Sequence, residues 1–82
     1  MNPIFIANPV HTLEDLARGI LTAAYGPKDA ANRPVPTNLD ALADLLRETQ
    51  VKRVVVASWR VEGSSTSKMR AVFEDEGVEL AA

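Results

Sequence analysis

Three short apolar runs along the chain have the composition of β-strands. Residues 4–7 are β-prone and end at Asn8-Pro9, residues 52–59 are rich in valine, and residues 78–81 follow Gly77. The run over 52–59 does not alternate with polar residues. That pattern is typical of a strand that is covered on both faces or lies at the centre of a parallel sheet, and we expect it at the centre.

Between these runs the apolar residues recur at helical spacing. The first predicted helix follows a capping box at Thr12 and ends before Gly26-Pro27; its apolar positions are Leu13, Leu16, Ile20, Leu21 and Ala24. The second begins at Thr37 or Asn38, either of which can cap it, and ends about Thr49-Gln50; its apolar positions are Leu39, Leu42, Ala43 and Leu46. The third follows the turn at 63–67, which offers several N-caps, and ends at Gly77; its apolar positions are Met69, Val72 and Phe73.

The order βααβαβ predicts an α/β fold, in which a three-stranded parallel β-sheet packs with about three α-helices. With 82 residues, the chain is long enough for one domain, which we place at 1–82. Phe5 and Phe73 are expected in its core. Residues 27–37 contain three prolines and no apolar period, so they predict an exposed loop. Long loops are often functional, although a tolerated insertion is the commoner explanation.

Composition narrows the class of protein. The chain is 46% hydrophobic and 24% charged, which favours a folded domain, and it has no cysteine for disulfides or thiolate metal sites. A formal charge of −2 lacks the positive excess that non-specific nucleic-acid binding requires. No secretory leader and no apolar run of 18 residues is evident. We therefore expect a cytoplasmic protein that binds neither nucleic acid nor membrane.

Few residues suit catalysis. His11 is the only histidine, and no acid is placed by periodicity to face it, so we expect it to be an exposed turn residue. Neither of the first two expected strands, at 4–7 and 52–59, leads into a glycine-rich phosphate loop. These observations predict no enzyme, no metal and no cofactor.

Carboxylates are the more informative feature. Asp40 and Asp44 lie one turn apart on the exposed flank of the second predicted helix, with Glu48 further along it. Asp40 can complete a capping box with Thr37, whereas Asp44 weakens its helix. Either Arg47 pairs with Asp44 on an ordinary solvated face, or Asp44 serves a partner. The acids at 74–76 crowd the negative end of the third helix, and they are either incidental or converge with Asp40 and Asp44 on a basic partner.

Residues 38–44, with the sequence NLDALAD, resemble the second-helix signature of the barstar family, which inhibits barnase-type ribonucleases. Residues 13–16, 54–60 and 72–77 resemble other parts of the family in the same order. The resemblance implies a barstar-like three-stranded parallel sheet. It also implies a bacterial, cytoplasmic antitoxin or immunity protein, monomeric when free, that plugs the active site of a secreted, guanyl-type ribonuclease.

The resemblance also implies the partner-binding residues. Asp44 would take the place of the substrate phosphate, and Asp40 would contact neighbouring groups, with Asn38 and Ala41 in the same motif. An acid just after Phe73 would join them; Asp75 is the first choice and Glu74 the other. Tyr25 would correspond to a contact tyrosine.

The chain departs from the family pattern at the loop before this motif. Residues 27–37 replace a short loop with paired aromatics, Ala43 stands where the family often has a bulky aromatic, and Leu45 replaces a cysteine of barstar. The two helix changes affect packing more than binding. The altered loop leaves open an alternative function, a barstar-fold interaction module that binds a protein other than a ribonuclease.

Overall fold

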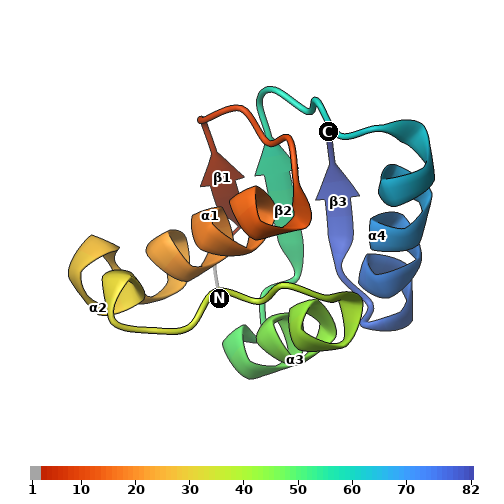
Figure 1. The fold of residues 1–82 in the computed structure, drawn as a ribbon. Helices are drawn as coiled ribbons and strands as arrows, with labels where there is room; N and C mark the ends of the chain where they lie inside the picture. Colours follow the sequence, from red (N-terminus) through yellow and green to blue (C-terminus); the bar gives the residue numbers. More distant parts are fainter. Residues whose placement is uncertain (1–2) are drawn as a thin grey trace.

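The computed structural model describes residues 3–82 of the chain, which form three strands and four helices (Figure 1). In chain order they are β1 (Ile4–Ile6), α1 (Leu13–Tyr25), α2 (Pro27–Ala31), α3 (Leu39–Thr49), β2 (Arg53–Val56), α4 (Gly63–Asp75) and β3 (Glu79–Ala81).

The strands form one parallel sheet in the order β1-β2-β3. Val54 at the centre pairs with Ile4 on one side and Leu80 on the other. An isolated bridge between Val10 and Trp59 extends the pairing of the first two strands beyond the turn at Asn8-Pro9. The predicted α/β class, the parallel sheet and the central place of the valine-rich strand are confirmed.

Helices cover one face of this sheet. Ile4, Ile6, Val54 and Val56 are buried toward the helices, and α1 crosses in front of the strands in Figure 1. The opposite face carries Phe5, which is 65% exposed, and a half-buried Val55. The prediction that Phe5 belongs to the core is therefore wrong. Of the two alternatives given for β2, the central place in the sheet holds and coverage on both faces does not. A continuous apolar run does not show whether helices cover one face of the sheet or both.

The core lies between the sheet and the inner sides of α1, α3 and α4. Phe73 is 1% exposed, as predicted, and packs with buried leucines of α1 and α3. Leu45 of α3 is also buried, although the predicted apolar face omitted it. Gly19 lets α1 lie close to β1, because a Cβ there would come within 2.8 Å of the Ile6 side chain.

Residues 27–31, which were predicted as loop, form the short helix α2. Pro27 occupies its first turn, where a missing N–H costs nothing, and Gly26 turns the chain with a positive φ of 85°. Ala30 is buried and α2 packs against α1. The rest of the predicted loop, residues 32–37, is irregular, as expected. The prolines of this segment were interpreted as a sign of loop structure. Pro27 nevertheless suits the first position of a helix, so the short helix α2 was missed.

The helix ends follow local hydrogen bonding. Thr12 caps α1 by accepting from the Asp15 N–H at 3.2 Å, as predicted, and Gly77 follows α4 with a φ of 69°. The N-cap of α4 is Glu62, without a side-chain bond to the helix backbone, so the predicted caps within 63–67 are wrong. Gln50 ends α3 in the left-handed region at a φ of 55°.

The exposed Phe5 and the buried Phe73 give a matched pair of tests. Phe73→Ala should lower the free energy of unfolding by about 3–5 kcal/mol, because it leaves a cavity in the core. Phe5→Thr should lower it by less than about 1 kcal/mol, because the ring is largely solvated and threonine suits a strand. Urea denaturation measures both. Comparable losses would contradict the open sheet face.

Candidate functional site

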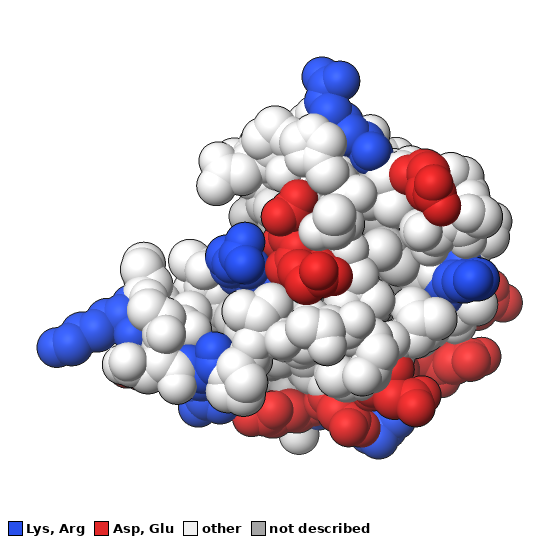
Figure 2. Space-filling view, viewed as in Figure 1, with Lys and Arg blue, Asp and Glu red and all other residues white. Residues whose placement is uncertain are grey.

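Six carboxylates gather where α3 lies beside the end of α4. They are Asp40, Asp44 and Glu48 of α3, and Glu74, Asp75 and Glu76 at the end of α4, and we call them the acidic edge. The two helices pack against each other, and Figure 2 shows acidic side chains along the lower margin of the molecule, where these elements lie in Figure 1. The two acidic segments therefore belong to helices that pack against each other.

Arg47 of α3 joins the two halves of the acidic edge. Its guanidinium donates two hydrogen bonds of 2.9 Å to the Glu76 carboxylate, from Nε and Nη2. Glu76 is 18% exposed at its side chain, and its pKa lies below the ordinary value because of these bonds. The same contact raises the pKa of Arg47. This bidentate pair fixes the end of α4 against α3.

Asp44 points to solvent and also touches Arg47. Its side chain is 72% exposed, and Arg47 Nη1 donates to its Oδ1 at 3.1 Å. The interpretation in which Arg47 pairs with Asp44 thus describes the free chain correctly. Both side chains are exposed and lie about one helical turn apart, so the pair contributes at most about 1 kcal/mol to the free energy of unfolding. Asp44 remains accessible to a stronger partner.

Asp40 is exposed at the start of α3, but it does not complete a capping box. Asn38 is the cap, because its Oδ1 accepts from the Ala41 N–H at 2.8 Å. The predicted role of Asp40 opposite Thr37 is therefore wrong: the helix starts one residue later, which places Asp40 at the second position. A carboxylate there still interacts favourably with the helix dipole. Ala41 itself is half-buried.

Glu74 and Asp75 are both exposed at the end of α4. Within residues 3–82 neither makes an ion pair, in contrast to Glu76. Together with Asp40, they leave charge on the acidic edge that the described part of the chain does not pair.

Tyr25, Arg33 and Glu48 form a cluster that holds the loop 32–38 against α3. The Arg33 guanidinium lies 3.7 Å from the centre of the Tyr25 ring, and its Nη1 lies 3.3 Å from Glu48 Oε1. The Tyr25 hydroxyl donates to the same oxygen at 2.9 Å. Tyr25 is thus brought beside α3, as its predicted membership of the site requires. Sequence reasoning did not single out Arg33, since no spacing rule links a loop arginine to a distant tyrosine.

A hollow of about 300 Å³ lies between α3 and residues 33–37, which we call the proline-rich segment. Arg33, Asp44, Leu45 and Glu48 are among its lining residues. The exposed flank of α3 is therefore concave on the side of Asp44, and its wall is the loop that the Tyr25 cluster holds in place.

His11 is exposed in the turn before α1, as expected, but an acid lies beside it. Its backbone N–H donates to Asp15 Oδ2 at 3.0 Å, and its Nδ1 lies 3.6 Å from the same oxygen. The statement that no acid faces it is wrong, because the turn before α1 folds back on the first helical turn, which periodicity within a helix does not describe. The hydrogen bond from His11 lowers the pKa of Asp15.

No protein-family model, no curated protein and no solved structure gives a significant match to this chain. Over residues 3–82, no group of three or more potential ligands among His, Cys, Asp and Glu is placed to hold a metal ion. None of the described helices has the length and apolar character needed to cross a bilayer. The site is thus characterised by its own geometry.

Tyr25 reports on the cluster, because it is the only tyrosine in the chain. Burial, and then the hydrogen bond and charge of Glu48, raise its pKa above 10.0. Glu48→Gln should bring the pKa back toward that value, whereas Glu79→Gln on β3 should not. Titration of tyrosinate absorbance measures this effect. Equal shifts in both variants would contradict the cluster.

Glu76 should contribute to stability in a pH-dependent way. Because its pKa in the folded chain lies below the ordinary 4.5, the contribution is present above about pH 4.5 and is lost as the pH falls through the folded value. Glu76→Gln should therefore be less stable than the parent at pH 7, with a difference that shrinks in acid. Urea denaturation at pH 7 and in acid, well below about pH 4.5, measures this difference in stability. Glu74→Gln is the matched control, and an equal effect there would argue against the Arg47 pair.

Proposed function

We propose that the chain is a barstar-like inhibitor whose acidic edge occupies the active site of a barnase-type, guanyl-specific ribonuclease. A cell that secretes such an enzyme needs an internal inhibitor, so the proposed role is that of a cytoplasmic antitoxin or immunity protein. The observation that carries the proposal is the exposure of Asp40 and Asp44 on one flank of α3, next to the acids at the end of α4.

Electrostatic complementarity supports this assignment. An enzyme that cleaves RNA binds phosphate with cationic side chains, and a row of carboxylates at matching spacing can replace the phosphates. Asp44 would lie in the phosphate position, Asp40 beside it, and Asp75 or Glu74 at the margin. The resemblance of residues 38–44 and 72–77 to the barstar family implies the same roles.

The intramolecular pair of Asp44 does not oppose this function. Arg47 makes two bonds to Glu76 and one to Asp44, so it keeps its main partner when Asp44 turns to an arginine of the enzyme. The Asp44–Arg47 pair is exposed, so giving it up on binding costs at most about 1 kcal/mol.

The loop favours a second candidate function. Arg33 places a positive charge on the wall of the hollow beside Asp44, and the segment 33–37 covers part of that flank. This surface would suit a partner that offers an acidic group next to its cations. The alternative is therefore a barstar-fold interaction module that binds a protein other than a ribonuclease.

Asp44→Ala is the sharpest test of the proposed inhibitor. Binding to a barnase-type ribonuclease should weaken by about 2–5 kcal/mol, as expected for truncation of one member of a buried interfacial charge pair. The free energy of unfolding of the free chain should change by less than about 1 kcal/mol, because the ion pair with Arg47 is exposed. Isothermal titration calorimetry and urea denaturation measure the two effects.

Asp29→Ala is the control, since Asp29 is an exposed acid on α2, away from the acidic edge. Its affinity for the enzyme should equal that of the parent chain. Equal affinity of the Asp44 variant would exclude the assigned role of Asp44. Failure of the parent chain to bind or inhibit any barnase-type ribonuclease would exclude the inhibitor and favour the interaction module.

A further inference from the structure

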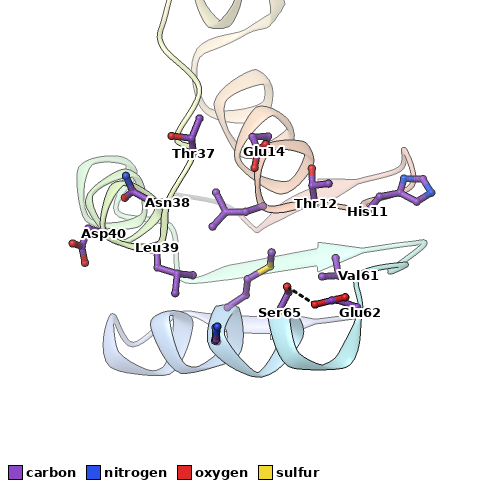
Figure 3. A pocket seen from close by; sticks show the side chains of 13 residues that line it. His11, Thr12, Glu14, Thr37, Asn38, Leu39, Asp40, Val61, Glu62 and Ser65 are labelled. Carbon is purple, nitrogen blue, oxygen red and sulfur yellow. Dashed lines mark hydrogen bonds between the residues drawn. The ribbon is translucent and has the colours of Figure 1, made fainter.

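The N-terminal ends of α1, α3 and α4 border an open cavity of about 790 Å³, which we call the N-terminal cavity (Figure 3). Its apolar lining consists of Leu13, Leu39, Val61 and Met69. The first three are half-buried and pack against the core, and Figure 3 shows Leu39 pointing into the space between α3 and α4. The cavity thus offers apolar surface that the described part of the chain leaves partly open to solvent.

Two carboxylates approach this apolar floor from different helices. Glu14 lies in the first turn of α1, and Glu62 precedes α4. The Ser64 hydroxyl donates to Glu62 Oε1 at 2.7 Å and the Ser65 hydroxyl at 3.3 Å, so this carboxylate is fixed in place. The same hydrogen bonds lower its pKa.

The remaining charges set the sign of the ligand that the cavity would accept. Lys68 also lines it and partly offsets the carboxylates. Asp40 lies at the margin, where Figure 3 shows its carboxylate pointing away from the centre. The carboxylates of Glu14 and Glu62 outnumber the ammonium of Lys68, so the inner side chains favour a cation over a further anion. A cation with an apolar stem fits both the floor and the rim.

We propose that the N-terminal cavity receives an arginine side chain of a protein partner. The methylene groups would pack on Leu13, Leu39 and Val61, and the guanidinium would pair with Glu14, while Glu62 adds negative charge at the rim. Thr37, Asn38 and Asp40 line the same cavity, so the arginine would enter beside the start of α3. That this partner is a ribonuclease rests on the proposed function; the preference for a cation does not.

The test uses the free chain and a small probe, N-acetyl-arginine amide, followed by ¹H–¹⁵N NMR. Saturable shifts are expected at the amides of Leu13, Leu39, Val61 and Ser65. Glu14→Gln should weaken the probe about two- to fivefold, and Lys68→Gln should strengthen it by a similar factor, as expected for one charge at the rim of a partly solvated site. Opposite signs separate electrostatic recognition from a loss of structure, which would weaken the probe in both variants.

Three results would overturn the proposal. They are an absence of saturable shifts at the cavity, changes of the same sign in the two variants, and an equal response to N-acetyl-glutamate amide. No ribonuclease is present, so this outcome is independent of the Asp44 test. If the cavity binds the probe but the chain binds no ribonuclease, the arginine site stands. Only the proposal that its partner is a ribonuclease then fails.

Discussion

The architecture depends on a sheet that is covered by helices on one face only. Three short strands and 82 residues provide one core, and this core forms between the buried side of β2 and the inner sides of α1, α3 and α4. Each helix therefore turns its outer side to solvent. Because α3 contacts α1 and α4 rather than lying flat on the strands, its polar flank and its first turn both remain accessible. The acidic edge and the N-terminal cavity are consequences of that packing.

Charge on this surface is organised by two arginines. Arg47 links α3 to the end of α4, and Arg33 links the proline-rich segment to α3 through Tyr25 and Glu48. One arginine attaches a helix end to α3 and the other attaches a loop to the same helix. Asp40, Glu74 and Asp75 take part in neither pair within residues 3–82. The surface therefore combines carboxylates that hold the fold together with others that are free for a partner.

The sequence predicted what depends on local pattern. Strand and helix positions, the cap at Thr12, the parallel sheet and the burial of Phe73 all follow from periodicity and capping chemistry. The exposure of Phe5 did not follow, because one apolar residue looks the same whether or not a second layer covers it. The α2 helix, the contact between His11 and Asp15, and the Tyr25 cluster also escaped prediction. Each depends on how the chain folds back, which a one-dimensional pattern does not contain.

The contact between Arg47 and Asp44 means that the chain carries its own counterion at the centre of the acidic edge. A bare aspartate attracts salt and solvent cations, whereas this one already has a tethered positive group within hydrogen-bonding distance. An incoming cation would exchange with that group rather than with dissolved ions. Ionic strength should therefore change the rate of association with a cationic partner mainly through the unpaired acids Asp40, Glu74 and Asp75. The replacement of Arg47 by the partner's cation at Asp44 should depend more on close-range fit.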